Sequence, residues 1–166
     1  MNWHEKFFGM VDLVKSWSHD PSTKVGAVIV DEENNVRSVG YNGFPRGVWD
    51  DQPERYERPI KYKWTEHAER NAIYAAARHG TPMDGCIIYV GWFPCADCAR
   101  AIVQCGIKHV NIDGRKYKGN SAADQRWAED FFVAEHILLE GDVEFTILDI
   151  ENGEWYERKS TVSEID

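Results

Sequence analysis

Two short motifs bring together residue types that can hold a metal ion and move a proton. The first is His-Ala-Glu at residues 67–69, and the second is Pro-Cys-Ala-Asp-Cys at residues 94–98. Zinc favours imidazole and thiolate ligands, and a catalytic zinc site keeps only three protein ligands so that water can occupy the fourth position. We therefore predict that His67, Cys95 and Cys98 bind one catalytic zinc ion.

The spacing within the motifs supports this interpretation. Cys95 and Cys98 lie three residues apart, about one helical turn, so both sulfurs can face the same point. The N-terminus of a helix also favours the thiolate form that a metal requires. Glu69 is placed to take a proton from zinc-bound water, whose pKa falls to roughly 7, and to deliver it to departing ammonia. Together the two motifs form the pattern of zinc deaminases, which attack the amidine-like carbon of an aminopyrimidine or aminopurine.

The two cysteines could instead serve a redox or a structural role. A thioredoxin-like redox role for the Cys-x-x-Cys pair would leave His67 and Glu69 without a purpose. A structural zinc site needs a fourth ligand, for which Cys86 and Cys105 are conceivable. Both lie in apolar runs, where a buried free cysteine is the commoner outcome. We expect these two cysteines in the core, and the remaining histidines at the surface or in satisfied hydrogen bonds.

The spacing of apolar residues predicts the elements that position the motifs. Helical periodicity is found at residues 3–17, 65–79, 95–105 and 122–140. Apolar and β-branched runs predict five strands, at residues 24–31, 36–41, 86–90, 109–113 and 143–148. This order indicates an α/β fold with helices on both faces of a sheet, in which an antiparallel hairpin precedes parallel strands. Residues 42–63 form a long loop, and such loops are usually functional.

Length and charge limit the class of protein. The 166 residues suffice for one domain, which we place at residues 1–150, followed by a polar, acidic C-terminal tail at residues 151–166. The sequence has no apolar run of roughly 18 residues and no signal-peptide pattern, so we expect a cytoplasmic protein without a membrane partner. A formal net charge of −9 argues against a nucleic-acid partner but not against a small anionic ligand.

Several segments beyond the zinc motifs carry a resemblance to the deoxycytidylate (dCMP) deaminases, within the cytidine deaminase-like superfamily. They are DPSTKVGAVIV, VGYNGFPRGVWDD, HAERNAIYAAARHG and FPCADCARAIVQCGIKHV, all between Asp20 and Val110. The zinc motifs alone fit any member of the superfamily. The Gly-Tyr-Asn-Gly element at residues 40–43, with the Asp50-Asp51 pair after it, is narrower and points to the dCMP branch.

The resemblance implies a fold, an activity and a set of catalytic groups. The fold would be a three-layer α/β/α sandwich with a five-stranded mixed sheet. The activity would be hydrolysis of dCMP to dUMP and ammonia, which supplies dTMP synthesis, with His67, Cys95 and Cys98 binding zinc and Glu69 moving protons. Related nucleotides, such as dCTP or a 5-modified dCMP, stay open as substrates. A deaminase of tRNA or single-stranded polynucleotide, and an idle nucleotide sensor, are less favoured alternatives.

The family pattern also suggests residues that contact the substrate. Asn42 would hold the sugar or base, and the backbone N–H of Ala68 would donate to the pyrimidine carbonyl. Gly91 and Trp92 depart from many relatives beside the expected base pocket, so Trp92 either admits a 5-substituted cytosine or simply covers the rim. The substrate-binding candidates are Asn42, Ala68, Trp92, Phe93, Lys24 and Tyr117.

The sequence offers several candidates for the residues that bind the phosphate. A basic cluster surrounds Tyr117 and could receive the phosphate or form a solvated loop, and Lys24 and Arg46 are alternatives. The cluster consists of Arg115, Lys116 and Lys118.

The same resemblance implies regulation by nucleotide triphosphates. In the family, dCTP activates and dTTP inhibits at a site between subunits, to which the Gly-Tyr-Asn-Gly region contributes. Gly40, Tyr41 and Gly43 are therefore candidate effector contacts, with Mg²⁺ as a possible companion of the triphosphate. Family members of this kind are commonly hexamers, so we expect a homo-oligomer.

Overall fold

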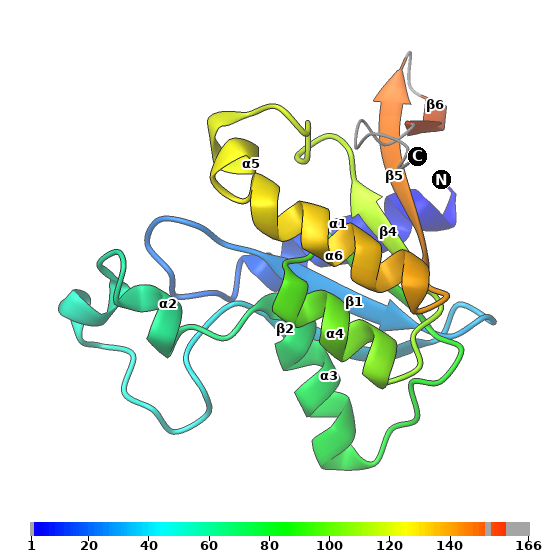
Figure 1. The fold of residues 1–166 in the computed structure, drawn as a ribbon. Helices are drawn as coiled ribbons and strands as arrows, with labels where there is room; N and C mark the ends of the chain where they lie inside the picture. Colours follow the sequence, from blue (N-terminus) through cyan, green and yellow to red (C-terminus); the bar gives the residue numbers. More distant parts are fainter. Residues whose placement is uncertain (1, 152–153, 159–166) are drawn as a thin grey trace.

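Six strands form one mixed sheet in the computed structural model, which describes residues 2–151 and 154–158 (Figure 1). The order across the sheet is β2-β1-β3-β4-β5-β6. Strand β1 is antiparallel to β2 and β3, the pairs β3–β4 and β4–β5 are parallel, and β6 is antiparallel to β5. The strands are β1 (Gly26–Val30), β2 (Val36–Tyr41), β3 (Ile87–Val90), β4 (His109–Asp113), β5 (Glu144–Glu151) and β6 (Glu154–Arg158).

The expected hairpin and parallel strands are confirmed, but the sheet has six strands and not five. Strand β6 lies within residues 151–166, which were expected to be a polar tail. Its polar composition concealed it, because an edge strand needs only a few apolar contacts. Trp155 supplies one by stacking on Phe8, with ring centroids 5.3 Å apart. Residues 159–166 of that predicted tail lie outside the described residues.

Helices cover both faces of the sheet, which confirms the three-layer α/β/α arrangement (Figure 1). Helix α1 lies on one face, and α3, α4 and α6 lie on the other. No described helix has both the length and the apolar character needed to cross a bilayer. The helices are α1 (Trp3–Lys15), η1 (Pro53–Tyr56), α2 (Lys61–Trp64), α3 (Ala68–His79), α4 (Ala96–Gln104), α5 (Ala122–Arg126) and α6 (Ala128–Glu140).

Strand β1 shows how the sheet separates two cores. Side chains alternate between the faces of a strand. Ala27 and Ile29 therefore join the core beneath α3, α4 and α6, whereas Val28 and Val30 join the core beneath α1. All four side chains are fully buried, which explains why β1 is continuously apolar in the sequence.

Three predicted segments differ from the structure. Helix α3 begins at Ala68 and not at residue 65, because His67 has an extended backbone and acts as the N-cap residue. The predicted helix at 122–140 is divided between α5 and α6 at Trp127, whose φ is −109°. The expected long loop contains η1 and α2. The spacing of apolar residues does not predict these helix boundaries, because side-chain contacts in the folded chain determine them.

Candidate active site

The three predicted metal ligands meet where two helices begin. His67 immediately precedes α3, Cys95 is the N-cap residue of α4, and Cys98 lies in the first turn of α4. The Nδ1 atom of His67 is 3.3 Å from the Cys95 sulfur and 3.6 Å from the Cys98 sulfur. The three ligand atoms all lie within 4.8 Å of one another. Within residues 2–151 and 154–158, no other group of three His, Cys, Asp or Glu side chains converges in this way.

These separations fit a zinc ion. With Zn–N near 2.0 Å and Zn–S near 2.3 Å, a tetrahedral centre places the nitrogen and sulfur atoms about 3.5 Å apart. The two separations from His67 agree with this value. Two sulfurs and one imidazole also leave the fourth position open, as in a catalytic site.

The surroundings of Cys95 favour its thiolate form. Hydrogen bonds from the Cys98 and His67 side chains, with the charge of His67, together lower the pKa of Cys95 to about 4 against the effect of desolvation. The Arg70 guanidinium lies 4.0 Å from the same sulfur and is held by Glu66. A thiolate is the form that binds metal.

Glu69 is the buried carboxylate beside this group. It lies in the first turn of α3, and its side chain is 5% exposed. Burial raises the pKa of the Glu69 carboxyl, although the charge of His67 opposes this. A carboxyl with a raised pKa accepts and returns a proton near neutral pH more readily than an exposed one.

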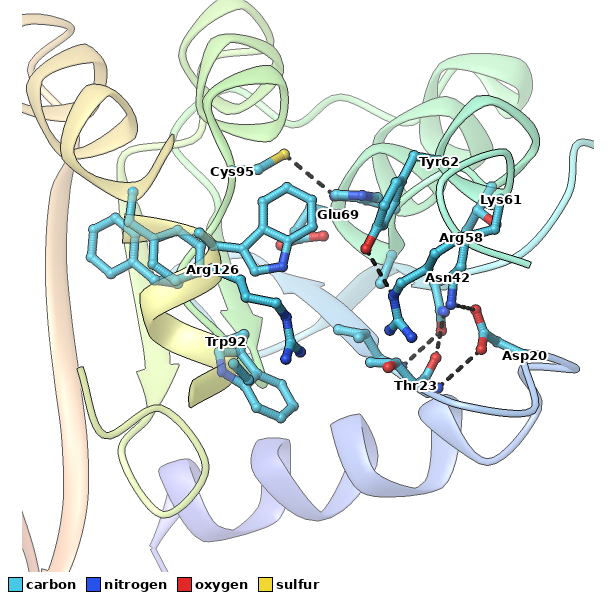
Figure 2. Close-up of a pocket in the computed structure, with 18 residues that line it drawn as sticks. Asp20, Thr23, Asn42, Arg58, Lys61, Tyr62, Glu69, Trp92, Cys95 and Arg126 are labelled. Carbon is cyan, nitrogen blue, oxygen red and sulfur yellow. Dashed lines mark hydrogen bonds and ion pairs between the residues drawn. The ribbon is translucent and has the colours of Figure 1, made fainter. Parts of the chain in front are cut away.

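A pocket lies next to these groups and gathers most of the predicted site (Figure 2). Ala68 lines it at the first position of α3, where a backbone N–H has no acceptor within its own helix. Cys98 is fully buried and does not line the pocket. The predicted residues that line the pocket are Asn42, His67, Ala68, Glu69, Trp92, Phe93 and Cys95.

Asn42 is buried and holds the neighbouring wall in place. Its Oδ1 accepts from the Val25 backbone N–H at 2.8 Å, and its Nδ2 donates to the Thr23 carbonyl at 2.7 Å. One amide N–H remains for a ligand. Asn42 therefore shapes the pocket as well as lining it.

Trp92 is fixed from the other side. Its indole N–H donates to Asp124 at 2.9 Å, and Asp124 also belongs to the capping box that begins α5. Trp92 is half-buried in the pocket wall and joins that wall to α5.

The predicted contacts Lys24 and Tyr117 lie outside the pocket. Lys24 is exposed, and its ammonium donates to the Ser18 carbonyl at 2.6 Å. Tyr117 is buried behind Phe93, with ring centroids 5.6 Å apart. Both residues are close to pocket residues in the sequence, but their side chains point elsewhere.

The basic cluster around Tyr117 is neutralised by acidic neighbours. Arg115 and Lys116 pair with Asp113 and Asp12, and Lys118 pairs with Asp149 at 3.2 Å. None of the three cations lines the pocket. The alternative Arg46 is exposed and also lies elsewhere.

The candidate effector residues support the start of α3. A Cβ atom at Gly40 would overlap the backbone of Ala68 and Ala72, so β2 can approach the helix only with glycine there. Gly43 exchanges two backbone hydrogen bonds with Glu66, the residue before His67. The carbonyl of Tyr41, whose ring is half-exposed, accepts from Asn71 at 2.8 Å. The three residues lie outside the pocket, next to the element that carries His67.

The sequence did not single out eleven of the pocket residues, and four of these bear on the shape and charge of the pocket: Arg58, Tyr62, Arg126 and Trp127. Arg58 donates from Nε to the Tyr62 hydroxyl at 2.9 Å, and Tyr62 packs edge-on against Trp127 at 5.8 Å. Trp127 in turn lies 6.1 Å from the His67 ring. Only the unusual length of the 42–63 loop signalled any of them.

Comparison with known proteins agrees with this geometry. Residues 1–113 match the model of the cytidine and deoxycytidylate deaminase zinc-binding region. The chain belongs to this deaminase family. The matched range contains the three predicted metal ligands and Glu69, whereas Arg126 and Trp127 lie beyond it.

Two relatives extend the deaminase likeness over most of the chain. A protein of Aliivibrio fischeri named "Uncharacterized deaminase in luxG 3'region" is 44% identical over 151 residues, covering 90% of this chain and 95% of the other. The deoxycytidylate deaminase of Homo sapiens is 38% identical over 128 residues, covering 74% of this chain and 71% of the other.

A solved deaminase structure has the same fold. The dCMP deaminase of cyanophage S-TIM5, in complex with dCMP and dUMP, superposes with a TM-score of 0.67 at 23% identity. The superposition covers 86% of this chain and 94% of the phage chain.

Proposed function

We propose that this deaminase is zinc-dependent and hydrolyses dCMP to dUMP and ammonia, a step that supplies dTMP synthesis. The relatives named deoxycytidylate deaminase support the substrate class. The observation that carries the proposal is the buried Glu69 carboxylate beside His67, Cys95 and Cys98, at a pocket that also contains two arginines.

The catalytic groups divide the reaction between them. His67, Cys95 and Cys98 would hold zinc, which supplies activation of water for attack at neutral pH. Glu69 accepts a proton from the attacking water and returns it to the exocyclic nitrogen, which leaves as ammonia. The N–H of Ala68 is free to donate to the pyrimidine carbonyl and thereby orients the ring.

The pocket walls suit a nucleotide. Trp92, Phe93 and Trp127 offer aromatic surface to a flat base, and Asn42 keeps one donor for the sugar or base. Trp92 is held by Asp124, so we interpret it as a fixed part of the rim.

Two arginines are free to receive the phosphate. Arg58 and Arg126 both line the pocket, and Figure 2 shows both guanidinium groups directed into it. Within the part of the chain that the structure describes, neither makes an ion pair with an acidic side chain. Unpaired guanidinium groups in a chain with a net charge of −9 favour an anionic ligand at this point.

The experiment is an ammonia-release assay on dCMP, dCTP, deoxycytidine and 5-methyl-dCMP. We expect kcat/KM to be highest for dCMP, and at least about 100-fold lower for deoxycytidine, which lacks the charge-assisted contacts. Arg126→Gln should reduce this preference for the phosphate, whereas Arg78→Gln on exposed α3 surface should not. Equal rates on dCMP and deoxycytidine would refute the phosphate assignment.

Regulation and assembly belong to the same proposal. A nucleotide triphosphate near Gly40, Tyr41 and Gly43 would contact the element that leads to His67. We therefore propose that dCTP activates, that dTTP inhibits, and that the chain forms a homo-oligomer. A substrate saturation curve that neither nucleotide changes would contradict the regulatory part.

A further inference from the structure

Lys61 is a deeply buried lysine in the pocket wall. Only 4% of the Lys61 surface is exposed, and a lysine is almost never buried so fully unless it has a charged partner. Its ammonium lies 2.8 Å from Asp20 Oδ2, and it donates to the Ser22 hydroxyl at 2.9 Å. Asp20 is 1% exposed, so the whole ion pair is removed from water. Figure 2 shows this pair at the edge of the pocket, away from Glu69 and Cys95.

Asp20 organises the wall to which Lys61 is attached. Its Oδ1 accepts the backbone N–H groups of Ser22 and Thr23, each at 2.9 Å. The Thr23 carbonyl accepts from Asn42, which directly follows β2 of the hairpin. The loop is therefore tied to the hairpin by Asn42 and to α2 by Lys61.

The segment that Lys61 holds carries two residues that line the pocket. Arg58 lies three residues before Lys61, and Tyr62 follows it directly. Helix α2 has four residues, too few to be stable by its own hydrogen bonds. Among the described residues, the Lys61–Asp20 pair is the only ion pair between residues 53–64 and the rest of the chain.

We infer that Lys61 is a positioning residue for the nucleotide: through Asp20 it holds Arg58 and Tyr62 at the pocket mouth. It acts on binding and not on the chemical step, because it contacts neither the metal ligands nor Glu69 in the structure. The inference rests on the proposed function for its kinetic consequences. Its structural consequence can be measured without any substrate.

The kinetic test compares Lys61→Met with Lys63→Met, a control on the exposed side of the same turn. We expect Lys61→Met to raise KM for dCMP at least about tenfold with kcat nearly unchanged, and Lys63→Met to change neither. KM for deoxycytidine should change less than KM for dCMP, since the phosphate contact is the one displaced. Lys61→Arg should recover part of the loss.

A second variant separates a loss of positioning from a general loss of stability. Lys61→Met alone leaves the Asp20 charge buried and unpaired, which can unfold the protein. Asp20→Asn/Lys61→Met removes both charges and should still show the raised KM. If that variant binds dCMP as Lys63→Met does, Lys61 positions nothing.

Hydrogen–deuterium exchange of the nucleotide-free protein separates this inference from the proposed function. Backbone amides of residues 57–64 should exchange faster in the double variant, while α3 keeps its protection. Unchanged exchange there would overturn the inference even if dCMP is the substrate. If the wild-type protein releases no ammonia from dCMP, the proposed function fails, and the exchange result still decides the role of Lys61.

Discussion

At the scale of single residues, Glu69 is distinguished from the other carboxylates by its position. It is buried and lies beside three side chains whose separations suit a metal ion. A ligand holds the ion, whereas a proton carrier must change its charge during each turnover. Substitutions at Glu69 and at a ligand should therefore have different consequences.

Glu69→Gln keeps the shape of the side chain and removes the group that carries the proton. We expect zinc content and dCMP affinity close to wild type, with kcat reduced by roughly 10²–10⁴. Metal analysis, equilibrium binding and ammonia release measure the three quantities. A variant with undiminished turnover would reject the proton-carrying role.

Cys98→Ser removes one of the two sulfurs that face His67. We expect zinc to fall well below the roughly one ion per chain that a three-ligand site holds, with activity lost in parallel. Cys86→Ser is the matched control, because Cys86 is also buried but lies in the core away from His67. Loss of zinc from both variants would point to general unfolding in place of lost coordination.

At the scale of elements, the position of α3 depends on its contact with β2. Gly40 is buried in β2 against the backbone of Ala68 and Ala72. Helix α3 follows His67 and carries Glu69, so any shift of the helix moves these two candidate catalytic groups. Glycine at this position is required by close packing.

Gly40→Ala should separate β2 from α3. We expect a loss of at least about 2 kcal/mol in the free energy of unfolding, because the new methyl group meets backbone and not flexible side chain. Gly9→Ala is the contrasting control: Gly9 lies in α1 with open space around it, and alanine should stabilise the helix by about 0.5–1 kcal/mol. Urea denaturation measures both. A lower free energy of unfolding for Gly40→Ala together with a higher one for Gly9→Ala supports the packing argument. Changes of the same sign in the two variants contradict it.

The elements themselves were largely predictable. All five expected strands and the main helices are present, because alternation and helical periodicity follow from which faces are buried. The break at Trp127 and strand β6 were missed. Trp127 is fixed by ring contacts with Tyr62 and His67, and β6 by its pairing with β5, so both depend on residues distant in the sequence.

At the scale of the whole molecule, buried carboxylates link stability to pH. Desolvation alone would raise the pKa of Asp20, but the hydrogen bonds from Lys61, Thr23 and Ser22 hold it below its usual value. A carboxyl with a depressed folded pKa stabilises the fold above its unfolded pKa of about 3.9, and that stabilisation is lost as the pH falls through the folded pKa.

Acid should therefore destabilise the wild-type protein more steeply than Asp20→Asn/Lys61→Met. We expect the free energy of unfolding to fall between pH values of about 5 and about 2 in both proteins, with a shallower slope in the variant. Denaturant unfolding at each pH measures this, with Lys63→Met expected to follow the wild type. Parallel curves for wild type and variant would show that Asp20 titrates alike in the folded and unfolded states.

The sequence by itself determined the α/β fold and the order of most elements, and it singled out the three candidate ligands and Glu69, which the structure brings together. These features depend on local spacing: a ligand pair separated by one helical turn, or an apolar face repeated with a fixed period. Only the tertiary structure decided which basic side chains are available to bind a ligand. Arg115, Lys116 and Lys118 form an obvious cluster in the sequence, yet the fold pairs each with a carboxylate.

The fold brings Arg58 and Arg126 to one pocket from segments 68 residues apart in the chain, 126 minus 58. Whether a cation binds a ligand or an acidic neighbour depends on distances in space, which sequence spacing does not specify. The same reason hid Lys61, whose partner Asp20 lies 41 residues away, 61 minus 20.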